Sequence, residues 1–425
     1  MNITDIINKN SKKIPLSKKE IKYVVDGYES GIINDKDMTL FLKSVCKNSL
    51  NYDEISYLTT SFIESGETLD LSYIKGIKVD KHSTGGVGDK TTLIIAPIVA
   101  CLGVPVAKMS GRGLGFTGGT IDKLESIPGF NVNMSEEEFI KEINNIGLSI
   151  ISQTKNLVPA DKSIYALRDV TNTVSSIGLI ASSIMSKKIA SGSDKVLIDV
   201  KVGRGALMSN YEEAFSLAET LIKIGEYHDL KVISILTNMD YPLGFNVGNA
   251  LEIKEVIDIL RNKTFNRLRE LSIVLASYMV QMGLEISYEE ANKQVLSVLE
   301  NNQAYLKFLE FIKYQGGKID NMLESSKKYE VFSERCGYIV DIDALTVGEY
   351  VRDLGAGRIN KSDAIDHSVG IVFNVEVGSY VEKNDLLYTI HYNNEPLDLI
   401  VLKNAVTIKD NKIKEKLIYE ILEGR

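Results

Sequence analysis

Cysteine is scarce in this chain of 425 residues, and the few cysteines present do not cluster. Cys46, Cys101 and Cys336 are odd in number and more than fifty residues apart, with no Cys-x-x-Cys pair among them. This spacing excludes a disulfide framework and a structural zinc site built from cysteine and histidine. We therefore expect a reduced protein.

Long apolar runs are also missing. The longest extends from Leu93 to Ala107, and Pro97, Gly103 and Pro105 interrupt it. It is too short to cross a bilayer. The first residues lack the basic segment and the apolar core of a secretory signal peptide. From these two absences we expect a soluble, cytoplasmic protein.

Positive charge is the third deficit. The chain has 49 Lys+Arg against 57 Asp+Glu, a formal net charge of −8, with a pI near 5.4. No summed positive field is available to attract nucleic acid or an anionic membrane, so both classes of partner are disfavoured. The composition, 44% hydrophobic and 25% charged, is that of an ordinary globular protein, and the length predicts two or three domains.

The hydrophobic pattern changes along the chain. In the first seventy residues, capping signals at Ser17, Asp35 and Asn51 precede three amphipathic helices. After about residue 77, short apolar runs alternate with helical patterns, which predicts an α/β domain around a largely parallel sheet. The expected strands cover 104–109, 148–152, 196–202 and 232–236, and the expected helices cover 136–146 and 212–224.

A helical insertion over 159–191 interrupts the α/β pattern, and helices resume at 250–323. Strand-like segments beginning at Gly337 and Gly370 then suggest a small separate domain. We expect an α/β protein with a small all-α domain packed beside a mixed, mostly parallel α/β domain, followed by a C-terminal α+β domain of the barrel-sandwich kind. The expected boundaries are 1–70 with 159–192, 71–158 with 193–330, and 331–425.

Glycine is concentrated where chemistry is expected. Nine of the 32 glycines lie between Gly85 and Gly119. The first glycine-rich segment, residues 81–92, precedes an apolar, helix-like run, so its backbone N–H groups and the helix dipole can meet at one anion. Lys81, Ser83 and Thr92 add a charge and two hydroxyl groups, the inventory that a phosphate needs. The segment is not a Walker A loop, because Asp89 stands between glycine and lysine.

A second glycine-rich segment, residues 108–120, follows the next expected strand. Gly113-x-Gly115-x-x-Gly118 matches the dinucleotide fingerprint. That fingerprint should open a long helix and reach an acidic strand end about twenty residues later, whereas Ser135 begins a helix at that distance. A dehydrogenase is therefore disfavoured. Two such loops fit one anion held from two sides.

The helical insertion supplies candidates for a facing wall. Ser183 and Lys187 are four residues apart and project from one helix face, and Arg168 precedes them. From the spacing alone, the favoured alternative is that Lys187 and its neighbour Lys188 form a solvated face.

A set of motifs spread along the chain favours the binding site over the solvated lysine face. Segments 81–92, 110–129 and 199–203, with Asp161-Lys162 and Arg168-Asp169, resemble the signature of the thymidine/pyrimidine-nucleoside phosphorylase family, and the likeness covers essentially the whole chain. The resemblance implies a homodimer whose subunits bind phosphate on the α/β side and the pyrimidine on the α side of a cleft. It implies reversible phosphorolysis of uridine, thymidine and deoxyuridine to free base and (deoxy)ribose 1-phosphate. Inorganic phosphate is the co-substrate, and no organic cofactor is implied.

The resemblance also assigns residues. The implied phosphate contacts are Lys81, Ser83, Thr92, Lys108, Ser110 and Thr120. The implied pyrimidine contacts are Arg168, Ser183 and Lys187, and the catalytic set is His82, Arg168 and Lys187. His82 is the group expected to protonate the leaving base. Lys108 favours the broader pyrimidine specificity, because strictly deoxy-specific relatives tend to carry an apolar residue there.

A potassium ion is implied at Gly88, Leu243, Asn246 and Glu255. Lys90 stands at a position that would line this ion, and its ammonium group could replace potassium outright. Phe116, Arg204 and Asn246 depart from the usual pattern of the family.

Two other functions remain open. An anthranilate-type phosphoribosyltransferase would have a related fold but would require magnesium. A carrier domain at the C-terminus would need an exposed lysine at a hairpin tip, and no such motif occurs near Gly378-Ser379-Tyr380-Val381.

Overall fold

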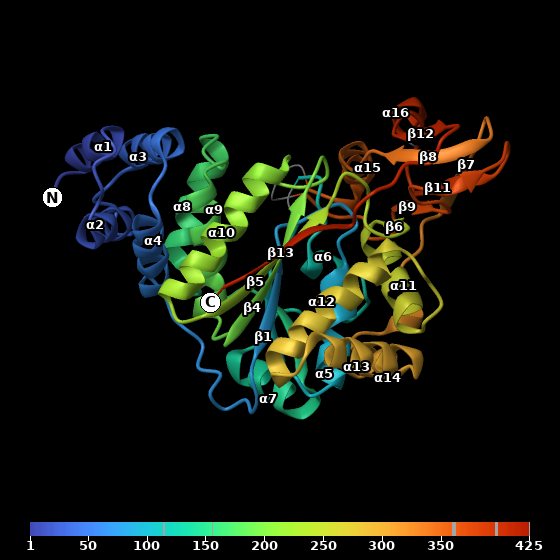
Figure 1. Cartoon of the computed structure of the whole chain (residues 1–425), viewed down its shortest axis with the longest axis horizontal. Helices are drawn as coiled ribbons and strands as arrows, with labels where there is room; N and C mark the ends of the chain where they lie inside the picture. The colour runs from blue at the N-terminus through green and yellow to red at the C-terminus, as the bar shows by residue number, and fades with distance from the viewer. Residues whose placement is uncertain (114, 155, 359–362, 396–397, 425) are drawn as a thin grey trace.

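The computed structural model describes residues 1–425 except 114, 155, 359–362, 396–397 and 425. Along its longest axis lie a helical part, a central sheet with helices on both faces, and a smaller β-rich part (Figure 1). This arrangement confirms the fold class expected from the hydrophobic pattern.

The helical part is built from two stretches of chain far apart in sequence. Both capping boxes expected at Ser17 and Asn51 are present. The first helix was not expected, because it is short and precedes the first strong capping signal. The helices are α1 (Ile3–Ser11), α2 (Lys18–Glu29), α3 (Asp35–Asn48), α4 (Tyr52–Glu64), α8 (Pro159–Val170) and α9 (Ile177–Ala190).

The central sheet has the strand order β1-β4-β5-β13. Its first three strands are parallel, and the last is antiparallel to β5. These strands are β1 (Val79–Ser83), β4 (Lys195–Val202), β5 (Lys231–Asn238) and β13 (Ile418–Glu423). A parallel pair, β2 (Val106–Ser110) with β3 (Leu148–Ser152), lies beyond β1.

Alternating residues of the strands face different layers. In β4, Val196 and Ile198 belong to the buried cluster shared with the helical part, whereas Leu197 belongs to the cluster on the other face. α10 (Tyr211–Tyr227) covers the first face, and α5 (Thr91–Cys101) with α12 (Arg267–Leu284) covers the second (Figure 1). The remaining helices around the sheet are α6 (Thr120–Glu125), α7 (Glu136–Ile146), α11 (Asn249–Leu260), α13 (Tyr288–Glu300) and α14 (Gln303–Tyr314).

The C-terminal part contains two small sheets, of order β10-β8-β12 and β6-β9-β11-β7. Its elements are β6 (Asn246–Val247), β7 (Lys327–Phe332), β8 (Gly337–Ile342), α15 (Ala344–Val351), β9 (Gly370–Phe373), β10 (Tyr380–Val381), β11 (Leu386–Tyr392), α16 (Leu399–Asn404) and β12 (Val406–Lys409).

Two strands pair across the boundary expected at residue 331, and β7 runs through it. β6 comes from the α/β part and pairs with β9. β13 leaves the C-terminal part and pairs with β5 in the central sheet, so the expected unit 331–425 is not continuous in space. Alternating strand and helix patterns indicate parallel strands that are joined by helices. They give no indication that β13 pairs antiparallel with β5.

Within the described part of the chain, no single helix is long and apolar enough to span a membrane. α12 and α13 meet that measure only as a pair, and they are bent by 118° at the break between them.

Candidate active site

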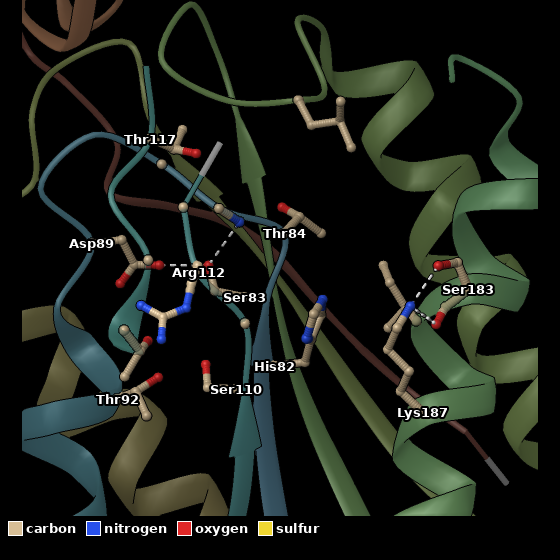
Figure 2. Close-up of a pocket in the computed structure, with 18 of the residues that line it drawn as sticks. His82, Ser83, Thr84, Asp89, Thr92, Ser110, Arg112, Thr117, Ser183 and Lys187 are labelled. Carbon is tan, nitrogen blue, oxygen red and sulfur yellow. Dashed lines mark hydrogen bonds between the residues drawn. The ribbon is translucent and has the colours of Figure 1, made fainter. Parts of the chain in front are cut away.

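A cavity of about 670 Å³ lies between the carboxyl ends of β1 and β2 and the helices α8 and α9. Figure 2 shows hydroxyl groups from the two glycine-rich loops on one wall and Ser183 with Lys187 on the other. His82 lies between the two walls, at the end of β1. A cleft of this size at the carboxyl ends of parallel strands is the usual position of a small-molecule site in an α/β fold.

The first glycine-rich loop connects β1 to α5. Gly85 and Gly88 have φ values of +93° and +72°, which only glycine adopts without strain. Asp89 organises the loop: Oδ1 accepts from the Thr91 amide at 3.1 Å, and Oδ2 accepts from the Ser83 hydroxyl at 2.5 Å. Burial alone would raise the pKa of Asp89, but the ammonium groups of Lys81 and Lys201 hold it well below its usual range.

Lys81 does not line the cavity, although the resemblance implied a phosphate contact there. Its Nζ donates to Thr91 Oγ1 at 2.6 Å and lies 3.4 Å from Asp199 Oδ2. Its side chain is 2% exposed. In this structure Lys81 supports the loop from behind.

The other implied phosphate residues all line the cavity. They are Ser83, Thr92, Lys108, Ser110 and Thr120. Thr92 lies in the first turn of α5, where the helix dipole favours an anion. The wall is therefore suited to an oxyanion.

The second glycine-rich loop connects β2 to α6. The Gly113 amide donates to Asp122 Oδ2 at 2.6 Å, and a Cβ on Gly113 would approach Thr117 O within 2.4 Å. α6 has only six residues, consistent with rejecting a dinucleotide fingerprint, which opens a long helix. Leu114, within this segment, lies outside the described residues.

Lys108 belongs to a buried chain of charges at the base of the cavity. Its Nζ donates to Lys81 O at 2.7 Å and lies 3.2 Å from Asp80 Oδ1, while Lys188 Nζ lies 2.5 Å from Asp80 Oδ2. Burial lowers the pKa of Lys108 to about 7, with Asp80 opposing the shift and Lys188 adding to it. Burial would raise the pKa of Asp80, but Lys108 and Lys188 lower it.

Arg168 forms part of the opposite wall and is held by backbone carbonyl groups. Its guanidinium donates to Thr173 O at 3.2 Å, to Leu179 O at 3.2 Å and to Val174 O at 2.9 Å. An arginine has five N–H donors, so two remain for other acceptors. Burial lowers the pKa of Arg168, but a guanidinium stays charged at neutral pH.

Ser183 and Lys187 share one acceptor on α8. Asp161 Oδ2 accepts from Ser183 Oγ at 3.0 Å and forms an ion pair with Lys187. Lys187 Nζ also donates to Ser183 Oγ at 2.8 Å. The lysine is thus held by α8 and α9 together, which a freely solvated lysine face would not require.

His82 lines the cavity, but its electrostatic surroundings differ from our expectation. Burial lowers its pKa well below the ordinary value, and the charges of Lys188, Lys108, Lys81 and Lys187 lower it further. The ring is therefore neutral at pH 7. The role of His82 in protonating the leaving base stays a prediction.

The residues implied for a potassium ion come together around a different cation. Lys90 Nζ donates to Leu243 O at 2.9 Å and Asn246 O at 2.6 Å, and it lies 2.8 Å from Glu255 Oε2. Because an ammonium group already takes these oxygens, a potassium ion does not fit this set. Gly88 packs against the same loop, where a Cβ would lie 2.7 Å from Leu243 O.

Two departures from the family pattern have structural roles. Phe116 lines the cavity and packs against the C-terminal cluster. Arg204 pairs with Asp341 at 2.5 Å and with Asp343 at 3.1 Å, which ties the loop after β4 to the C-terminal part.

The sequence assigned no role to the two acids that position these cations, although Asp161 is part of the family signature. Asp80 and Asp161 are only 2% and 1% exposed, and Lys188 was treated only as a neighbour of Lys187. Asp80 carries a usable signal, because a carboxylate inside a buried strand needs a cationic partner. Asp161 lies on a different helix from its partners, so spacing could not reveal it.

Comparison with known proteins defines the class. The family model described as glycosyl transferase family, a/b domain, matches residues 75–305, more than half of the chain. The model described as pyrimidine nucleoside phosphorylase C-terminal domain matches residues 338–409. The solved structure of anthranilate phosphoribosyltransferase from Thermus thermophilus is similar at TM-score 0.59 and 15% identity, covering 73% of this chain and 98% of that one. At that identity the likeness shows the fold alone.

Full-length relatives identify the family within this class. A pyrimidine-nucleoside phosphorylase of Staphylococcus epidermidis is 46% identical, covering 99% of this chain and 100% of the relative. Those of Staphylococcus haemolyticus and Staphylococcus aureus are 45% and 44% identical over the same shares. The α/β domain thus makes this a member of the glycosyl transferase class. Within it, the chain belongs to the pyrimidine-nucleoside phosphorylase family, which confirms the resemblance.

Proposed function

We propose that this protein catalyses the reversible phosphorolysis of pyrimidine nucleosides, including uridine, thymidine and deoxyuridine. The products are the free base and ribose or deoxyribose 1-phosphate. One observation carries the proposal: a single cavity is lined both by two glycine-rich loops suited to an anion and by the cationic side chains of Arg168 and Lys187. A hydrolase would have no need for these loops.

The anion wall binds phosphate as the nucleophile. Ser83, Thr92 and Ser110 line this wall with hydroxyl groups, and α5 begins there with the positive end of its dipole. A phosphate oxygen forms the new bond to the anomeric carbon while the bond to the base nitrogen breaks. The phosphate is already anionic, so no protein nucleophile is required.

The cationic wall stabilises the leaving base. The electron pair of the broken bond moves onto the base and its carbonyl oxygens. Arg168 donates hydrogen bonds there, and Lys187, whose three N–H groups are held by Asp161 and Ser183, supplies positive charge. Preorganised donors of this kind contribute about 3–4 kcal/mol each to lowering the barrier. Asp161 keeps Lys187 in place, and neutral His82 donates to the base or the sugar.

Lys108 supports a broad substrate range. Lys108 lines the cavity, and its Nζ lies 3.2 Å from Asp80 Oδ1. The resemblance associates a lysine at this position with the broader pyrimidine specificity. We therefore include uridine, which carries a 2′-hydroxyl group, among the substrates.

Three further features belong to this proposal. The two walls come from different domains, 1–70 with 159–192 and 71–158 with 193–330, so closing them excludes water.

The protein acts as a homodimer, as the resemblance implies, and it does so in the cytoplasm. Light scattering at micromolar concentration tests the dimer, which a monomeric mass would overturn.

The activity is tested by incubating the protein with uridine or thymidine, with and without phosphate. Ultraviolet absorbance follows the free base, and we expect its release only when phosphate is present. Equal release without phosphate would make the protein a hydrolase.

A further inference from the structure

Behind the anion wall of the cavity lies a buried cluster of four charged side chains that the proposed mechanism does not use. It contains Lys90 and Lys123 with Glu252 and Glu255, and each of these side chains is at most 3% exposed. Lys90 immediately precedes α5, and both glutamates lie on α11. The cluster therefore connects the first glycine-rich loop to the helix behind it.

The ammonium group of Lys90 has a complete set of acceptors. It donates to Leu243 O at 2.9 Å and Asn246 O at 2.6 Å, and pairs with Glu255 Oε2 at 2.8 Å. An ammonium group has three N–H donors, and each has an acceptor here. Backbone carbonyl oxygens are also what proteins use to replace the water around a potassium ion.

Glu255 is fixed independently of Lys90. Its Oε1 accepts from the Phe245 amide at 2.6 Å and from Asn266 Nδ2 at 2.8 Å, and its Oε2 accepts from the Asn246 amide at 2.9 Å. The loop carrying the carbonyl acceptors thus wraps around this carboxylate. Such a site is preformed for one small cation.

The charges of the cluster balance as the chain stands. Two ammonium groups face two carboxylates, with Lys123 Nζ lying 3.4 Å from Glu252 Oε2 and Lys90 paired to Glu255. A potassium ion added to this cluster would leave one buried positive charge without a partner, which is strongly unfavourable. A potassium ion could enter only where position 90 carries no charge.

We propose that the Lys90 ammonium is a covalently tethered replacement for the monovalent cation, so that this protein neither binds nor needs potassium. Lys90 is a positioning residue. Its cation joins the loop around Leu243 to the start of α5, where Thr92 faces the cavity. Gly88 packs on the same loop, and the Leu243 amide donates to Val87 O at 3.0 Å.

The first test uses the unmodified protein. Its melting temperature and its kcat/KM are measured in potassium chloride, sodium chloride and tetramethylammonium chloride at the same ionic strength. We expect no difference among the three salts in either quantity. A rise specific to potassium would overturn the proposal. The link to turnover rests on the proposed function, but the melting temperature does not, so failure of one can be told from failure of the other.

The second test removes the tethered charge. Lys90→Thr leaves room at the site, whereas Lys90→Met fills it with an uncharged chain of similar length. Without potassium, both variants should lose at least about tenfold in kcat/KM, because a buried carboxylate has lost its partner. Potassium at about 0.1 M should restore Lys90→Thr, in both melting temperature and kcat/KM, and should leave Lys90→Met unchanged.

Lys12→Thr, at an exposed lysine outside the cluster, is the matched control and should resemble the unmodified protein in every salt. A folded Lys90→Thr variant that ignores potassium would overturn the proposal, because the site would then not be a cation site. If Lys90→Thr folds in no salt, the salt comparison on the unmodified protein decides alone.

Discussion

The carboxylate of Asp161 on α8 forms an ion pair with the ammonium group of Lys187 on α9, and it also accepts a hydrogen bond from Ser183 at 3.0 Å. This acid is buried, whereas Lys187 faces the cavity. The pair therefore sets where the cationic wall presents its charge to the base.

Asp161→Asn should keep the shape of the site but remove the charge that holds Lys187. We expect kcat/KM for uridine to fall about tenfold or more, as for other groups that orient a catalytic residue. Steady-state kinetics measures the loss. Lys162→Ala, at an exposed position on the same helix, is the control. Unchanged kinetics in Asp161→Asn would contradict this positioning role.

Arg168→Ala and Lys187→Ala should each lower kcat/KM at least about tenfold, because each removes a positive charge from the wall that stabilises the leaving base. Circular dichroism should show that Lys187→Ala stays folded. Arg168 also holds the carbonyl groups of residues 173, 174 and 179, so Arg168→Lys serves as its milder companion. Near-normal turnover in either alanine variant would remove that residue from the mechanism.

The pH dependence of the reaction tests the state of His82. Burial and four lysine charges lower its pKa well below 6.5, so the ring is neutral at pH 6.5 and above and gains a proton only in stronger acid. We expect His82→Gln to lower kcat but to keep the shape of the kcat/KM profile between pH 6.5 and 8. An acid limb in this range that disappears in His82→Gln would show that the ring titrates there.

Lys108 should produce a pH effect of its own. Its pKa is lowered by burial to about 7, so the side chain is charged below pH 7 and becomes neutral above it. We expect the KM for phosphate to rise between pH 6 and 8 more steeply in the unmodified protein than in Lys108→Met. The ionisation of phosphate affects the KM of both proteins equally. The difference between their two pH profiles therefore reports on Lys108. Parallel profiles would contradict the assignment.

A chelator of divalent metal ions distinguishes phosphorolysis from the reaction of a phosphoribosyltransferase, the class of the solved structure with a similar fold. Phosphorolysis needs no divalent metal, so treatment with EDTA should leave kcat/KM within about twofold of its starting value. Complete loss of activity, restored by magnesium, would favour a phosphoribosyltransferase instead.

Much of the site was predictable because its signals are local. Glycine-rich loops after strands, with hydroxyl groups beside them, need only neighbouring residues, and Ser83, Thr92 and Ser110 all line the cavity. The α/β layers followed equally from alternating periodicities. The sequence also shows that Lys90 places a positive charge at a position that would line the implied potassium ion.

The rest depended on contacts between segments far apart in the sequence. β13 pairs with β5 across about 180 residues, and no local pattern specifies that partner. Lys81 turns from the cavity because Thr91 and Asp199 hold its ammonium group. The low pKa of His82 comes from burial and from lysines on β2 and α9 as well as on its own strand, which only the folded chain brings together.

The most direct measurement is a crystal structure of the protein with phosphate and uracil bound together. We predict phosphate between the two glycine-rich loops, in contact with Ser83, Thr92 and Ser110. Uracil should lie against Arg168, Ser183 and Lys187 on the facing wall. Phosphate or uracil bound outside this cavity, or both on the same wall, would contradict the account.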